Sequence, residues 1–356
     1  MKTDPLGIAQ VRRLTSRRVG RLIPRAAGVV ILLLLVGFVV VPQYGDALQA
    51  LHSVSLLSPL PLVLGLVLEL GALAALGALT RVALDPPARP SYPTVLRIDL
   101  AGVAVTNAVP GGGATALAVR YRFLTRAGMP SGAVAGGLAV EATVSNLVLG
   151  ALFAIGILLS VGSLPSSPYY WLAGGIILLV FGTVGVALVR AVRRPAGAVA
   201  FARSLTRSLS VAHQDRVAAL VEAVVSAVGG FASDRRRLVA AVSWSLANWL
   251  LDAAALWMFL AAFGYRLTPG HLLLAYGLAA ILALIPITPG GLGVIEGVLV
   301  PTVVAIGAPY SIAVLGVTAW RLVQFWMPIP LGGVSAVSLV ARSRARPRRV
   351  PHTQMN

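Results

Sequence analysis

The sequence predicts an all-α integral membrane protein, a polytopic helical bundle with about six full spans and two inverted re-entrant hairpins. Hydrophobic residues make up 58% of the 356 residues and charged residues only 11%. The mean hydropathy is +0.88, and together these values exclude a soluble domain. Long apolar segments alternate with arginine-rich loops, as in helices that cross a bilayer. Two apolar stretches are interrupted by proline and glycine, as in the broken helices of transport sites.

The composition also excludes several classes of function. The chain has no cysteine and four scattered histidines, so neither thiol chemistry nor a metal site is predicted, and we expect no cofactor. The net charge of +18 fits loops that face an anionic cytoplasmic leaflet, so no nucleic-acid partner is expected. The only lysine is Lys2 and no phosphate-binding loop is present, which excludes an ATP-driven pump encoded in this chain alone.

Three regions are predicted along the chain: a basic cytoplasmic leader at 1–25, a membrane domain at 26–341 and a basic cytoplasmic tail at 342–356. A cleaved signal peptide is the alternative for the first helix, since residues 45–47 are small enough for a cleavage site. The long basic leader favours a retained helix, because the rest of the chain is itself membrane-spanning. The expected location is the cell membrane, with both termini in the cytoplasm.

The apolar segments differ in length, and their lengths predict the first hairpin. Segments 98–109 and 113–126 would be roughly 18–21 Å long as helices, against a hydrocarbon core of about 30 Å, so neither can span alone. If 98–126 enters and leaves on one side, 27 of the 29 basic residues face the cytoplasm. We therefore predict a re-entrant hairpin, with its tip at Pro110, Gly111, Gly112 and Gly113. The apolar segments lie at about 26–44, 60–80, 98–109, 113–126, 131–160, 169–189, 238–263, 271–286, 293–307 and 310–341.

The second hairpin follows from the position of the C-terminal arginines. Segments 131–160, 169–189 and 238–263 cross outward, inward and outward, so an odd number of crossings must follow. In the simplest solution 271–307 is a hairpin entered from outside, and 310–341 is one long helix kinked near Pro328 and Pro330. Three separate short crossings would satisfy the same parity. The predicted tip consists of Pro289, Gly290, Gly291 and Gly293.

The two hairpins are predicted to belong to an internal repeat, with copies at about 98–160 and 271–341. A shift of 179 residues places 110–112 on 289–291 and also superposes the following glycines and prolines, namely Gly128 on Gly307, Pro130 on Pro309 and Gly137 on Gly316. Three crossings separate the copies, so they would be inverted, as in many secondary transporters.

The loop 190–237 is predicted to be cytoplasmic. Apolar residues between 201 and 228 recur at roughly helical spacing, with a break near 210–214. This pattern indicates either an amphipathic helical pair lying on anionic lipid or a linker helix that covers the bundle.

Ionisable side chains inside predicted spans are candidate functional residues, because a charge at mid-bilayer costs roughly 3 kcal/mol or more. Arg321 has a planar fork suited to a lipid phosphate, or it forms an ion pair with Glu296 or Glu141. Glu296 binds a proton or a headgroup amine, or it caps its own helix. Glu141 and Arg321 lie near the predicted midplane and would face one central cavity.

Two further ionisable residues, Asp252 and Glu69, complete the set, and Arg120 is a separate candidate. Asp252 is predicted to face the bundle interior, where it either has a functional role or stabilises the contact between helices. Glu69 is predicted to pair with a cation. Arg120 is predicted to snorkel at headgroup level or to guide a lipid phosphate toward the first tip.

Two motifs lie around the predicted tips. Pro-Gly-Gly-Leu-Gly-Val-Ile-Glu at 289–296, with Trp320-Arg321, Trp326, Pro328 and Gly332, resembles the second signature of the lysylphosphatidylglycerol synthase transmembrane-region family. Asn107-x-x-Pro-Gly-Gly-Gly with Arg120 and Leu124 resembles the first, and it makes Asn107 a candidate binding residue. The resemblance covers roughly 25–341 and implies a flippase-like membrane protein.

This chain departs from the family pattern in two respects. The soluble aminoacyl-transfer domain of full-length synthases does not follow the membrane region, so no enzyme activity is expected. Ala114 and Thr115 also stand where family members carry an acid after the first glycines.

The predicted function is movement of an anionic phospholipid or a polyprenyl-linked headgroup between leaflets. Arg321 would draw the phosphate between the two tips, and Glu296 or Glu141 would exchange a proton or receive a cationic headgroup. The alternative is a non-catalytic scaffold for a separate lipid-modifying or glycosyl-transfer enzyme that docks on 190–237. A membrane-embedded lipid transferase, with Glu296 or Asp252 as base, is a third interpretation.

Overall fold

A computed structural model describes residues 59–345, apart from 85, 87–88, 110, 163–167, 208–209 and 286–287. The predicted leader at 1–25, the first apolar segment at 26–44, the tip residue Pro110 and the tail beyond 345 lie outside the described residues. Within the described part the chain forms helices and loops and no strand. Five helices in it are long and apolar enough to cross a membrane. The prediction of an all-α polytopic membrane protein is therefore confirmed.

The first half of the described chain contains a long helix, a helical hairpin and a second long helix. The hairpin arms α4 and α5 pack against each other, as predicted for 98–126. α4 begins at Tyr92 rather than at residue 98, because Pro93 lies in its first turn, where the missing N–H costs no hydrogen bond. These four helices are α3 (Pro59–Ala83), α4 (Tyr92–Ala108), α5 (Gly112–Arg126) and α6 (Ser131–Ser160).

The second half repeats this order. Between its hairpin arms α11 and α12 lies a short 3-10 turn, η2, and the last long helix contains a π-helical turn, η3. The predicted single long helix at 310–341 is found as a continuous helix from Tyr310 to Arg342. Its irregular turn lies just before Pro328, as expected where a proline removes a helix donor. The elements are α10 (Arg235–Ala262), α11 (Pro269–Ala283), η2 (Pro289–Gly291), α12 (Val294–Ala305), α13 (Tyr310–Arg321), η3 (Leu322–Trp326) and α14 (Pro328–Ala345).

The two halves correspond in backbone detail as well as in order. Gly128 and Gly307 hold φ values of +102° and +109°, a region that favours glycine. Pro130 and Pro309 then cap α6 and α13 with φ/ψ values of −59°/139° and −57°/138°. The predicted offset of 179 residues joins both pairs. Since the same offset places α3 on α10, the correspondence begins earlier than the predicted repeats at 98 and 271.

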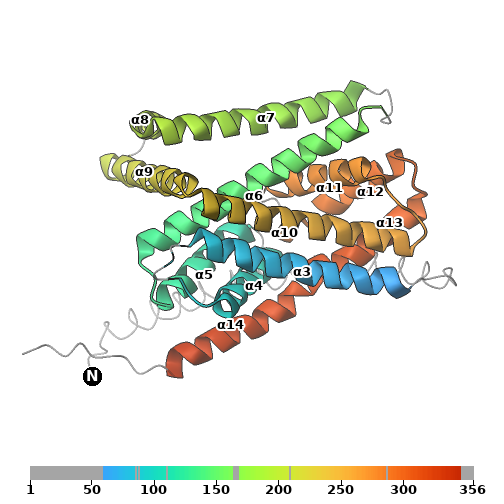
Figure 1. Ribbon diagram of the computed structural model, residues 1–356, viewed down its shortest axis with the longest axis horizontal. Helices are drawn as coiled ribbons and strands as arrows, with labels where there is room; N and C mark the ends of the chain where they lie inside the picture. The colour runs from blue at the N-terminus through green and yellow to red at the C-terminus, as the bar shows by residue number, and fades with distance from the viewer. Residues whose placement is uncertain are drawn as a thin grey trace, which may run out of the picture. The chain divides into compact units, whose positions relative to one another are not determined.

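Helices α3 and α10 lie side by side and run in opposite directions (Figure 1). Arg237, near the start of α10, donates hydrogen bonds to the carbonyl oxygens of Val82 and Leu84, at the end of α3. Farther along, the Asn248 side chain donates to the Ala72 carbonyl oxygen at 2.9 Å. The two halves are thus antiparallel along this contact, which is the relation that an inverted repeat requires.

Each hairpin packs against the long helix of the other half: α4 against α14, and α11 against α6. This exchange attaches each hairpin to the opposite half. Close approach at the first of these contacts depends on Gly332, where an added methyl group would overlap the Leu100 carbonyl oxygen and the Ala104 side chain.

Gly332→Ala is therefore expected to lower the free energy of unfolding by about 1–3 kcal/mol, because overpacking displaces α14 from α4. The measurement is thermal unfolding in detergent. Gly333→Ala is the matched control, since nothing lies within 4 Å of the added carbon there. Equal shifts for the two variants would contradict the packing argument.

The segment between the two halves contains α7 (Pro168–Arg193), α8 (Pro195–Leu205) and α9 (Val211–Ser233). The helical pair α8–α9 falls in the predicted loop 190–237, with α8 ending at Leu205 and α9 beginning at Val211. α9 packs against α6, α7, α8 and α10. Its stretch His213–Ser233 is also apolar enough to span a membrane by length and composition. A surface position for this pair stays a prediction.

Candidate functional site

Arg321, at the end of α13, is a buried charged residue that forms hydrogen bonds to residues of the second tip and its neighbours. Its side chain is only 4% exposed. Nε donates to Glu296 Oε1 at 2.6 Å, Nη1 to Gln324 Oε1 at 2.5 Å and Nη2 to the Gly290 carbonyl oxygen at 3.2 Å. All three guanidinium nitrogens are engaged, and one of them binds the tip itself.

Glu296 caps its own helix and also forms the ion pair that the sequence analysis considered for Arg321. One carboxylate oxygen accepts from Arg321, and the other accepts from the Gly293 backbone N–H at 2.7 Å. Gly293 is the N-cap of α12 and has a φ of +80°. The carboxylate therefore sits on an arginine and on a helix N-terminus at once, and these are two groups that proteins use to bind phosphate.

The two tips meet through Asn107, the last buried residue of α4. Its Nδ2 donates to the Phe325 carbonyl oxygen at 2.9 Å. In a π-helical turn that oxygen would accept from residue 330, which is a proline without an N–H. Its Oδ1 lies 2.6 Å from the position of a Cβ on Gly290, whose φ is +50°. Asn107 thus supplies the hydrogen bond that the Phe325 carbonyl oxygen would otherwise lack. It also leaves no room for a side chain at Gly290.

The remaining tip residues differ in exposure. Gly111, with φ +64°, is the N-cap of α5 and has no side-chain cap hydrogen bond. Gly112 is buried, and a Cβ there would lie 2.6 Å from the Val105 carbonyl oxygen. Gly113 is exposed, whereas Pro289 and Gly291 are buried. The 3-10 turn η2 contacts both α4 and α5, so the tips adjoin as predicted from the repeat.

A second charged group joins the first hairpin to α3 and α6. Arg120 Nε donates to Asp99 Oδ1 at 2.9 Å, and its Nη2 donates to Glu141 Oε2 at 2.9 Å and to Thr80 Oγ1 at 3.0 Å. Asp99 is 2% exposed and Glu141 is 6% exposed. Arg120 therefore points into the bundle, which corrects the interpretation of a snorkelling residue.

One expectation from the sequence changes as a result, and one residue of this group was missed. Glu141 pairs with Arg120 and not with Arg321, so the two arginines hold separate ion pairs instead of sharing one central cavity. Asp99 was missed because it lies at the edge of its predicted segment. It stands 11 residues before Pro110, and Arg120 stands 7 residues after Gly113 on the other arm. Opposite charges on the two arms can face each other across a hairpin. That spacing is the signal that would have found it.

A third group lies next to Arg321 and centres on Asp252 of α10. Its Oδ2 accepts from the Tyr276 hydroxyl at 2.8 Å, and its Oδ1 accepts from Trp320 Nε1 at 2.9 Å. Glu69 of α3 is 3% exposed, and its carboxyl group contacts that of Asp252. The expected cation partner of Glu69 is thus replaced by a second acid, although the charge of Arg321 acts on both carboxyl groups.

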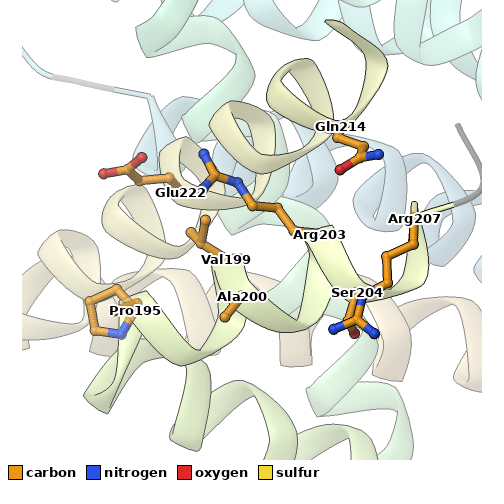
Figure 2. A pocket seen from close by; sticks show the side chains of 9 residues that line it. Pro195, Val199, Ala200, Arg203, Ser204, Arg207, Gln214 and Glu222 are labelled. Carbon is orange, nitrogen blue, oxygen red and sulfur yellow. The ribbon is translucent and has the colours of Figure 1, made fainter. Parts of the chain in front are cut away.

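Away from these groups, a pocket of about 670 Å³ opens between α8 and α9 (Figure 2). Its polar lining residues include Arg203, Arg207, Gln214 and Glu222. A larger apolar groove of about 1040 Å³ lies between α7, α8 and α9, with Arg190, Arg193 and Arg194 among its lining residues. The pocket lies in the predicted docking region 190–237, and the groove lies mostly within it.

Comparison with known proteins agrees with this architecture. Residues 25–332 match the family described as lysylphosphatidylglycerol synthase TM region. A UPF0104 membrane protein of Pyrococcus horikoshii is 31% identical over 103 residues, which are 29% of this chain and 31% of that protein.

Two UPF0104 membrane proteins of Methanothermobacter thermautotrophicus are 28% and 34% identical over 104 and 107 residues, or 29% and 30% of this chain. In each case the match covers 30% of the relative. The aligned part of the chain thus spans less than a third of these three relatives. The family match covers far more of the chain. It includes both hairpins and the residues around both Arg120 and Arg321. The chain belongs to the family of the lysylphosphatidylglycerol synthase TM region.

Proposed function

We propose that this protein moves an anionic phospholipid, or a polyprenyl-linked headgroup, between the leaflets of the cell membrane, with both of its termini in the cytoplasm. The observation that carries the proposal is the position of the Glu296 carboxylate. It bridges Arg321 and the N-terminus of α12 at 2.6 and 2.7 Å. An anion therefore already occupies a site built from a buried arginine and a helix N-terminus, beside a broken helix.

A lipid phosphate can replace this internal anion. Arg321 carries five N–H donors in a planar fork, which suits two phosphate oxygens as well as it suits a carboxylate. Displacement of Glu296 would free the Gly293 N–H at the same time, so the phosphate would gain both contacts together. Glu296 then acts as a stand-in that keeps the site neutral between transport events.

The first tip adds a second set of donors. α5 starts beside η2 and has no side-chain cap on its first turn, so its N-terminal amides are available for phosphate oxygens. Ala114 and Thr115, where family members carry an acid, do not compete for those amides. In this proposal the headgroup passes between the two tips and the lipid tails stay in the bilayer.

The test is leaflet-resolved movement of fluorescent lipids in proteoliposomes. Phosphatidylglycerol and a polyprenyl phosphate are expected to move faster with protein than without it. Phosphatidylcholine with the same tails is the control. The protein is expected to increase its rate of movement much less, because its headgroup carries no net negative charge. If folded protein accelerates none of the anionic lipids, the transport proposal is wrong.

The alternative of a scaffold is favoured by one observation, the polar pocket between α8 and α9 (Figure 2). Arg203 and Arg207 line it and could bind an acidic partner surface. A scaffold would lose its cellular function when both are changed to glutamine and would tolerate a neutral pair at Arg321 and Glu296. A transporter would show the reverse.

A further inference from the structure

The charges around Arg321 do not balance. Glu296, Glu69 and Asp252 bring three carboxyl groups, and Arg321 is the one cation that acts on all three among the described residues. Its direct partner is Glu296, at 2.6 Å. Glu69 and Asp252 contact each other, and no ion pair of either with a cation is seen among the described residues. An unpaired buried charge costs several kcal/mol.

The contact between these two carboxyl groups has a chemical requirement. An ionised carboxylate only accepts hydrogen bonds, so two carboxyl groups hydrogen-bond to each other only when one of them carries a proton. Both Asp252 oxygens already accept, from Tyr276 and Trp320. Glu69 Oε2 is buried and has no hydrogen-bond partner in the described structure. Glu69 is therefore the member placed to hold the proton and donate it to Asp252.

We propose that Glu69 and Asp252 form a proton-binding site that shares one exchangeable proton. One proton from water adds to the anionic pair, the Glu69 carboxyl donates to the Asp252 carboxylate, and the step is reversed by release of the same proton. The described groups that face the pair come from four other elements. They are Tyr276 of α11, Trp320 and Arg321 of α13, Glu296 of α12 through Arg321, and Gln324 of η3 through Arg321.

The site has a direct connection to the proposed phosphate site. Trp320 donates to Asp252, and the next residue, Arg321, holds the second tip. A lipid phosphate bound at Arg321 adds negative charge near the pair, so phosphate and proton each favour binding of the other. This coupling rests on the proposed function, and it makes the lipid and the proton travel in the same direction.

Infrared difference spectroscopy of the purified full chain tests the proton site without any transport. The wild type is expected to show a protonated-carboxyl band that shifts in D₂O and is lost as pH rises. Glu69→Gln and Asp252→Asn are each expected to remove that band, and either variant suffices if the other does not fold. Glu222→Gln, which changes an exposed acid on α9, is expected to keep it. A band that survives in a folded Glu69→Gln or Asp252→Asn protein overturns the proton site.

A pH-sensitive dye inside proteoliposomes tests the coupling. Proton entry is expected to accompany movement of phosphatidylglycerol in the wild type and to be lost in Glu69→Gln. Lipid movement without proton movement in the wild type overturns the coupling. If no lipid moves but the infrared band behaves as expected, the proposed function fails and the proton site is supported.

Discussion

Arg321→Gln is expected to reduce the movement of anionic lipid by about tenfold or more and to destabilise the protein. The variant removes the guanidinium fork that would hold the phosphate, and it leaves Glu296 buried without its cation. Removing one partner of a buried ion pair costs about 3–5 kcal/mol. Thermal unfolding in detergent and the leaflet-resolved lipid assay measure the two effects separately.

The double variant Arg321→Gln/Glu296→Gln separates folding from function. It removes both charges, so most of the lost stability is expected to return, because neutral partners of similar size replace a buried pair at little cost. Transport is expected to stay low, since no cation remains for the phosphate. Arg342→Gln, at an exposed arginine on α14, is the control. Wild-type transport by a stable double variant would show that Arg321 is purely structural.

Arg120→Gln is expected to lower the free energy of unfolding as much as Arg321→Gln, by about 3–5 kcal/mol, because it leaves two buried acids without their cation. Asp99 and Glu141 both lose their cation, and Thr80 loses its donor. These contacts join α3, α4, α5 and α6, so the first hairpin should detach from the bundle. The free energy of unfolding measures the loss. Because the chain has no native cysteine, single cysteines introduced on α5 and labelled with a probe would report the detachment.

Two further variants show whether charge is the cause. Arg122→Gln changes an exposed arginine two positions along the same helix and is expected to shift stability by no more than about 0.5 kcal/mol. The triple variant Arg120→Gln/Asp99→Asn/Glu141→Gln is expected to recover most of the loss. If the triple variant is no more stable than the single one, side-chain packing and not charge is responsible.

Part of the fold could be predicted from segment length and charge. Segments 98–109 and 113–126 are each too short to span, and the arginines around them belong on one side, so a hairpin was the consistent solution. The structure has that hairpin as α4 and α5. The offset of 179 residues was visible because turn positions such as Gly128 and Gly307 restrict the residue type in both copies.

The pairing of the charges could not be predicted in the same way. Asp99 and Arg120 come within 2.9 Å because the hairpin folds them together, and Glu141 joins them from the next helix. Glu69 and Asp252 are far apart in the sequence and meet because α3 and α10 pack antiparallel. Helical periodicity gives the face on which a side chain lies, but it does not say which other helix covers that face.

The sequence by itself determined that this is a polytopic helical membrane protein of a recognisable family, with two broken helices and a few acids and one central arginine in apolar surroundings. Those properties follow from composition, segment length and backbone requirements, which can be read from the sequence without knowing which helices pack together. Only the tertiary structure decided that Glu296 holds Arg321, that Arg120 binds two acids, and that Glu69 faces Asp252. These contacts join different helices, some neighbouring and some distant in sequence, and a buried charge takes its partner from whichever helix packs against it.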